Sequence, residues 1–123
     1  CIAVGAMSPC NERKNTSSCD GEGYWGSNYG SDLDFLTPGV RIHTITNSGG
    51  YTTTFNGTSS ACPHAAGIAG LILSVAPLMT PEQVRMVMQM NADDIGNLGF
   101  DNQTGYGRIN AYESVLNLLN SPE

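Results

Sequence analysis

Basic side chains are scarce in this chain. Lysine and arginine together total 5 among 123 residues, against 11 aspartates and glutamates, and the formal net charge is −6. A nucleic-acid-binding surface needs lysine and arginine to neutralise phosphates, so this balance argues against a nucleic-acid partner. The acidic excess points to no particular partner, because acidic surfaces often only keep a protein soluble.

Long apolar runs are also missing. No segment reaches the roughly 20 consecutive apolar residues that a membrane-spanning helix needs, so we expect no membrane partner. Residues 1–6 are apolar but have no basic flank, which is unlike a signal peptide. They are typical of a buried strand that begins abruptly, and we therefore expect the chain to have been cut from a longer one.

Four cysteines are present. Cys10 and Cys19 bracket a polar segment, so a disulfide between them would staple a surface loop; two free thiols are the alternative. A bridge would imply an oxidising compartment and hence a secreted or extracytoplasmic protein. Cys1 lies in an apolar strand and Cys62 among small residues, and both are expected to be buried. The four lack the close pairs of a zinc site.

The order of apolar and polar segments predicts a single α/β unit over residues 1–123. Residues 1–7 alternate too little for a half-exposed strand and are typical of a parallel sheet. Thr37-Pro38-Gly39 predicts a turn, and the loop 93–103 is expected to be solvated. The further expected strands are 33–36, 40–46 and 51–55; the expected helices are 59–76, one opened by a capping box at Thr80 and Gln83, and 111–119.

The segment 59–76 is rich in Ala, Gly, Ile and Leu. It is apolar on nearly every face, so we expect a helix buried on all sides. Gly67 and Gly70 weaken a helix and would be explained by a closely packed neighbouring backbone. The remaining elements of this chain supply thin cover for such a helix. The missing cover is therefore expected from another chain or from a lost N-terminal half.

A hydroxyl group precedes this helix, in the stretch Asn56-Gly57-Thr58-Ser59-Ser60-Ala61-Cys62-Pro63-His64. The N-terminus of a helix carries unpaired N–H groups and a partial positive charge. These groups can hold the oxyanion that forms when a serine attacks a carbonyl. The competing interpretation is that the serine or threonine only caps the helix, which is the commoner use of such residues.

The same stretch resembles the serine signature of the subtilase family, Gly-Thr-Ser-any-Ala-any-Pro. Gly57, Thr58, Ser59, Ala61 and Pro63 all match it. Further segments resemble the family in the same order along nearly the whole chain: 1–6, 27–34, 37–39, 80–85 and 105–111.

This resemblance implies the C-terminal part of a subtilisin-like fold, with parallel strands packed on a buried central helix that begins at the nucleophile. Ser59 would be that nucleophile, forming an acyl-enzyme with a protein or peptide substrate, and its own N–H would donate to the oxyanion. Asn56, Gly57 and Thr58 would form the substrate and oxyanion edge. Catalysis would need no cofactor.

A serine needs a histidine base oriented by an aspartate. His64 lies five residues beyond Ser59, roughly 140° around the helix, and His43 lies on an expected exposed strand. In the subtilase family the catalytic Asp, the His and the oxyanion Asn all precede this segment. The expected partner is therefore the N-terminal half of the same catalytic domain, as a separate chain. The alternatives are a non-catalytic fragment or pseudoenzyme half that acts as a structural or binding module, and an independent hydrolase built on Ser59 and His43.

The resemblance also places Asp34 near a cation site in relatives, together with the carbonyl of Cys1. A structural calcium ion at Asp34 is therefore one prediction. The alternative is a loop aspartate that hydrogen-bonds the backbone.

Overall fold

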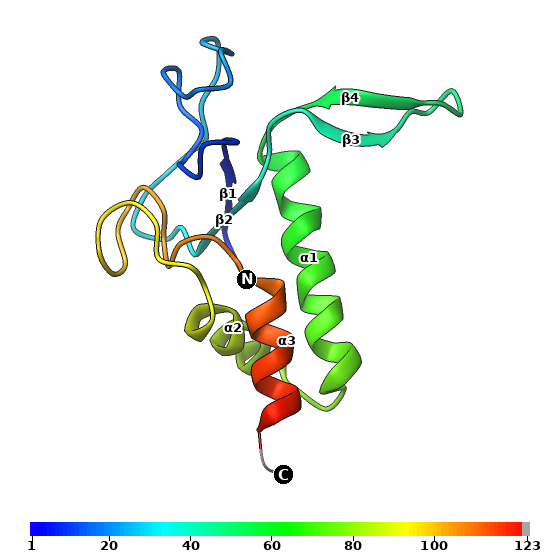
Figure 1. Ribbon diagram of the computed structural model, residues 1–123, viewed down its shortest axis with the longest axis vertical. Helices are drawn as coiled ribbons and strands as arrows, with labels where there is room; N and C mark the ends of the chain where they lie inside the picture. The colour runs from blue at the N-terminus through cyan, green and yellow to red at the C-terminus, as the bar shows by residue number, and fades with distance from the viewer. Residues whose placement is uncertain (122–123) are drawn as a thin grey trace.

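Two short parallel strands and one long helix form the centre of the chain (Figure 1). The computed structural model describes residues 1–121. Strand β1 pairs with β2, placing Val4 opposite Phe35 and Met7 opposite Pro38. The backbone at Arg108 bridges Leu36 in parallel and extends the pair by one short segment. In chain order the elements are β1 (Val4–Met7), β2 (Phe35–Pro38), β3 (Ile42–Ile45), β4 (Tyr51–Phe55), α1 (Thr58–Val75), α2 (Pro81–Met90) and α3 (Ala111–Asn120).

Strands β3 and β4 form an antiparallel hairpin that projects away from the rest of the chain (Figure 1). Ile45 lies opposite Tyr51, and the pairing is irregular between Ile42 and Thr44. The large side chains of Ile45 and Tyr51 are exposed within this chain. The hairpin therefore contributes little to the core.

Helix α1 packs against β1, β2, α2 and α3. The main core lies between these elements, and a smaller core lies under the loops that follow β1 and precede α3. The main cluster consists of Phe35, Ala65, Ile72, Val84, Met88 and Ile109, and the smaller one of Met7, Leu33, Leu36 and Ile95.

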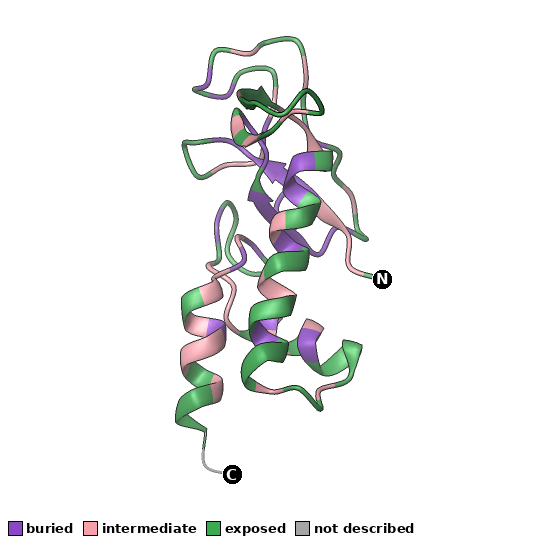
Figure 2. Ribbon diagram, turned by 90° about the vertical axis from the view of Figure 1, so that its right-hand side faces the viewer, coloured by how far each residue is buried: buried purple, intermediate pink, exposed green. Residues whose placement is uncertain are grey.

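Within the described residues this helix has the thin cover that we predicted, and burial on all sides would need the further segment expected from another chain or a lost N-terminal half. Only four of the 18 residues of α1 are buried, namely Ser60, Ala61, Ala65 and Ile72. Figure 2 shows much of the helix as exposed, and the side chain of Leu71 is 52% exposed. A Cβ atom at Gly67 or Gly70 would meet no neighbour within 4 Å, so the close backbone approach predicted there is also absent from residues 1–121.

Within residues 1–121, α1 is the one helix long and apolar enough to cross a membrane by length and composition alone. It has 18 residues with a mean hydropathy of 1.2, and 22% of them are buried. A core helix of a globular protein meets the same criterion. Thr37 Oγ1 donates to the Ala61 carbonyl of α1 over 2.6 Å, which ties the helix to the strand pair.

Local sequence signals set the start of α2. Thr80 Oγ1 accepts from the Gln83 N–H at 3.2 Å, and the Thr80 N–H donates to Gln83 Oε1 at 2.8 Å. This is the predicted capping box. By contrast, the turn predicted from Thr37 is wrong, because β2 continues to Pro38.

Of the predictions for the cysteines, the disulfide is confirmed and the burial of the other two is wrong. Cys10 and Cys19 form a disulfide with 6.2 Å between their Cα atoms. Cys1 and Cys62 are exposed rather than buried, because the elements within residues 1–121 leave the start of β1 and one face of α1 uncovered.

The prediction that the loop 93–103 is simply solvated is wrong, because internal contacts hold the loop. The Arg108 guanidinium pairs with Asp93 over 2.6 Å, and this contact lowers the pKa of Asp93 more than partial burial raises it. Thr104 donates to the Ile95 carbonyl over 2.9 Å, and Ile95 is buried.

Candidate active site

The turn between β4 and α1 is fixed by backbone hydrogen bonds around Gly57. The Gly57 N–H donates to the Gly39 carbonyl at 2.8 Å, and the Gly57 carbonyl accepts the Ser60 and Ala61 N–H groups at 3.0 and 3.2 Å. Gly57 has φ 114° and ψ 174°, a conformation that strongly favours glycine. A glycine at this position is therefore required by the turn that leads into the helix.

The two adjacent serines have different environments. Ser60 is 1% exposed, and its hydroxyl donates to the carbonyls of Gly57 and Gly39 at 2.8 and 3.2 Å. Ser59 is exposed. Ser60 is thus a structural residue, whereas the hydroxyl of Ser59 is accessible in the first turn of α1.

Helix α1 has Gly57 at its N-cap position and no side-chain cap hydrogen bond. The alternative interpretation of this stretch, a serine or threonine that only caps the helix, therefore does not apply. The first N–H groups of the helix remain near Ser59, where they can stabilise negative charge.

Neither histidine is joined to Ser59 by a hydrogen bond within residues 1–121. His64 Nδ1 donates to the Ser60 carbonyl of its own helix at 2.8 Å, as expected for a packed helix histidine. His43 lies in the projecting hairpin, where it is exposed and stacks on Tyr51 with 5.5 Å between ring centroids. The geometry does not favour a Ser59–His43 pair.

The side chain of Asn56 is held at both ends. Its Oδ1 accepts the Arg41 N–H at 2.6 Å, and its Nδ2 donates to Glu22 Oε2 at 2.7 Å and to the Tyr24 hydroxyl at 3.3 Å. Glu22, Tyr24 and Arg41 were not found from the sequence. Glu22 lies 34 positions from Asn56, in a loop without periodicity, so no sequence signal connects them.

Glu22 is kept anionic by its neighbours. The hydrogen bond from the indole of Trp25, at 2.8 Å, is the largest influence and lowers the pKa of Glu22. Partial burial opposes it, but contacts with Arg41 and Tyr24 add to the lowering. A negative charge therefore lies beside the side chain of Asn56, and Asn56 is three residues before Ser59 in the sequence.

A hollow of about 370 Å³ adjoins the turn between β4 and α1. Thr58 lines it, together with Val4 at the start of β1 and residues 28–33 of the following loop. Open space therefore borders the turn that leads to Ser59 within this chain.

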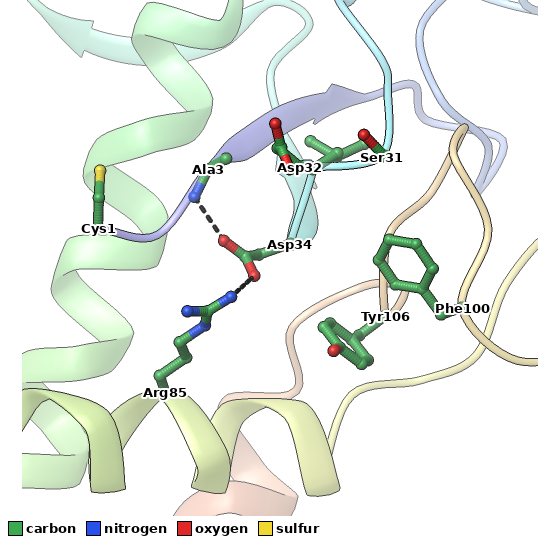
Figure 3. A pocket seen from close by; sticks show the side chains of 9 residues that line it. Cys1, Ala3, Ser31, Asp32, Asp34, Arg85, Phe100 and Tyr106 are labelled. Carbon is green, nitrogen blue, oxygen red and sulfur yellow. Dashed lines mark hydrogen bonds and ion pairs between the residues drawn. The ribbon is translucent and has the colours of Figure 1, made fainter.

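Another hollow, of about 520 Å³, surrounds Asp34 at the far end of the strand pair (Figure 3). Asp34 Oδ2 accepts the Ala3 N–H at 2.8 Å, and Oδ1 accepts from the Arg85 guanidinium at 2.6 Å. The hydrogen bond to Asp34 raises the pKa of Arg85. Asp34 thus ties β1 to α2 through a half-buried ion pair.

Comparison with known proteins decides the family. The sequence model of the Subtilase family matches residues 1–107. The chain belongs to the subtilase family. Subtilisin E of Bacillus subtilis (strain 168) is 44% identical over 96 residues, which are 78% of this chain and 22% of that protein. Alkaline elastase YaB of Bacillus sp. (strain YaB) is 36% identical over 110 residues, 89% of this chain and 25% of that protein.

Solved structures confirm the subtilisin-like α/β fold. A protease of Pseudoalteromonas arctica PAMC 21717 aligns with a TM-score of 0.76 at 23% identity, over 95% of this chain and 35% of that chain. Fervidolysin of Fervidobacterium pennivorans, a keratinolytic enzyme related to subtilisin, aligns with a TM-score of 0.73 at 24% identity, over 94% of this chain and 19% of that one. This subtilase chain therefore spans about a fifth to a third of the length of these four relatives.

One relative is named a calcium-dependent protease, that of Nostoc sp., 45% identical over 84 residues, which are 62% of this subtilase chain and 13% of that protein. The donor set at Asp34 does not fit a calcium ion, because both carboxylate oxygens already accept N–H groups and one of those donors is a guanidinium. Residues 1–121 also contain no cluster of three or more His, Cys, Asp or Glu side chains placed to hold a metal. The geometry fits the alternative prediction, an aspartate bonded to the backbone.

Proposed function

We propose that this chain supplies the nucleophile of a serine endopeptidase, with Ser59 forming an acyl-enzyme on the carbonyl carbon of a peptide bond. The observation that carries the proposal is the exposed Ser59 in the first turn of a helix without a side-chain cap, inside the matched subtilase segment. The neighbouring Ser60 is buried and hydrogen-bonded, so it is a poor candidate for attack.

The chain's own groups contribute to two parts of this reaction. The Ser59 N–H, at the helix N-terminus, would donate to the oxyanion of the tetrahedral intermediate. Gly57 would let the substrate main chain approach, and Asn56 and Thr58 would border it, since Thr58 lines the adjacent hollow.

The proton of Ser59 must pass to a histidine held by an aspartate. We propose that both come from the N-terminal half of the same catalytic domain. The chain spans only 22% of Subtilisin E, and α1 exposes Leu71, Leu73 and Val75. Leu71 and Val75 are four positions apart and share one face of the helix, whereas Leu73 lies on the opposite side. Apolar side chains exposed on two sides of a helix are suited to burial against further segments.

A secreted or extracytoplasmic location is part of the same proposal. The Cys10–Cys19 disulfide supports it, because disulfides persist in oxidising compartments. Catalysis by this machinery requires no cofactor, and we propose no calcium ion at Asp34.

The second candidate function is a non-catalytic binding or structural half. It is supported by the lack, within residues 1–121, of any histidine hydrogen-bonded to Ser59. Peptide hydrolysis by the complete protein separates the two candidates. Ser59→Ala should abolish turnover while Ser60→Ala, the matched control, should retain a measurable part of it. Hydrolysis by Ser59→Ala equal to that of the unaltered protein would exclude Ser59 as the nucleophile, and no hydrolysis by the unaltered complete protein would favour the non-catalytic half.

A further inference from the structure

A group of charged residues lies directly beside the turn between β4 and α1 that leads to Ser59. Glu22 Oε2 accepts from both Asn56 Nδ2 at 2.7 Å and Trp25 Nε1 at 2.8 Å, and Glu22 Oε1 accepts from Arg41 Nε at 3.1 Å. Both carboxylate oxygens are therefore engaged by protein donors. Within residues 1–121, the hydrogen bond from Asn56 is the one that joins this carboxylate to the segment of Ser59.

The backbone of Glu22 is fixed by a buried ion pair. Lys14 and Asp20 have fully buried side chains and lie 3.2 Å apart. Lys14 Nζ donates to the Glu22 carbonyl at 2.8 Å, and Asp20 Oδ1 accepts the Glu22 N–H at 2.9 Å. Both peptide groups of Glu22 are thus anchored, and its carboxylate is presented to Asn56 from a rigid support.

Arg41 completes the arrangement from the other side. It has a φ of 51°, in the left-handed region that non-glycine residues seldom adopt. In this conformation its N–H donates to Asn56 Oδ1 at 2.6 Å and its guanidinium donates to the Asp20 carbonyl at 2.7 Å. Strain of this kind persists only where the surrounding contacts over-determine it.

We propose that Glu22 is a positioning residue for the proteolytic reaction: its carboxylate fixes the Asn56 amide and thereby the turn that presents Ser59. The inference rests on the proposed function of Ser59. Glu22 does not touch the reacting atoms. It acts by limiting the conformations of the Asn56-Gly57 peptide, whose glycine would otherwise be free to reorient.

The test is a reciprocal exchange in the complete protease. Glu22→Gln removes the negative charge and leaves a neutral amide beside the Arg41 guanidinium and the Asn56 amide. We expect kcat to fall about threefold with KM nearly unchanged. Asn56→Asp places two carboxylates together, and we expect a fall of about tenfold or more. In the double variant the amide introduced at position 22 can donate to the carboxylate introduced at position 56, so kcat should recover above that of Asn56→Asp. Glu12→Gln is the matched control in the same loop, and it should leave kcat unchanged.

Failure of this inference can be distinguished from failure of the proposed function. Amide hydrogen exchange at residues 57–60 reports the order of the turn whether or not Ser59 reacts. Faster exchange in Asn56→Asp that is restored in the double variant supports positioning by Glu22, even if the unaltered protein proves inactive. Additive effects of the two substitutions on both exchange and kcat, with no recovery in the double variant, would overturn it.

Discussion

Removal of the Lys14 ammonium should open the loop that carries Glu22. Lys14 Nζ donates to the carbonyls of Asn15 and Glu22 at 2.6 and 2.8 Å and to Ser18 Oγ at 3.1 Å, and it pairs with Asp20. The substitution Lys14→Met keeps most of the buried stem and removes all of these contacts. Asp20 is then left as a buried charge without its cation.

Breaking a fully buried pair by removing one partner costs about 3–5 kcal/mol. Asp20 Oδ2 already has no hydrogen-bond partner among the described residues, so the remaining carboxylate cannot easily compensate. Lys14→Met/Asp20→Asn removes the orphaned charge while keeping an acceptor for the Glu22 N–H. We expect this double variant to regain about half or more of the lost stability.

The pH dependence has a definite sign. Burial works to raise the pKa of Asp20, but hydrogen bonds from the Glu22 N–H, Ser18 and Lys14 outweigh it, and the net pKa is lowered. The stabilisation by Asp20 is therefore fully present above its unfolded-state pKa, about 3.9, and is lost as the pH falls through the lower folded value. Lys14→Met should move this loss to higher pH, because burial is then opposed by fewer contacts.

Amide exchange of residues 10–25, with urea denaturation of the complete protein, measures both effects. The single variant should show strongly increased exchange in this loop, and the double variant should show partial recovery. Exchange that changes by less than the equivalent of about 1 kcal/mol in Lys14→Met would refute the reasoning, because so small an effect is typical of surface pairs.

Other contacts lead to three further predictions. Gly39→Ala would place a Cβ 2.5 Å from Ala6 Cβ and 3.0 Å from the Gly57 carbonyl oxygen. The turn that leads to Ser59 should therefore shift, and we expect the fractional loss of kcat for peptide hydrolysis to exceed the fractional loss of thermal stability measured by Tm. Asp93→Asn loses a half-exposed pair with Arg108 and should cost about 1 kcal/mol or less in urea at neutral pH; because the pKa of Asp93 is lowered, its contribution is present above about pH 4 and should vanish in acid. Replacing both cysteines of the disulfide with serine should cost up to about 3 kcal/mol, and an unchanged denaturation midpoint would contradict this.

Local signals made part of this structure predictable. Alanine, glycine and leucine content indicated a helix from Ser59, and it was found at Thr58–Val75. Thr80 and Gln83 indicated the start of α2, because capping involves residues that are close in sequence.

Contacts between distant segments could not be predicted in this way. Arg85 lies 51 positions from Asp34 and Glu22 lies 34 from Asn56, and neither pair has a spacing that local rules describe. The burial of α1 was predicted from a composition suited to a complete domain, but its Leu71 face is uncovered in this chain. Composition therefore indicated how deeply the helix is buried in a complete domain, not how much of that cover this chain provides.

Identification of the atom that reacts with a fluorophosphonate tests the central claim most directly. The complete protein should gain the mass of one phosphonyl group, and peptide mapping should place it on Ser59, not on the buried Ser60. Prior unfolding should prevent the reaction, since an isolated serine hydroxyl is a weak nucleophile. A folded protein that shows no labelling, or labelling at a residue other than Ser59, would contradict the account.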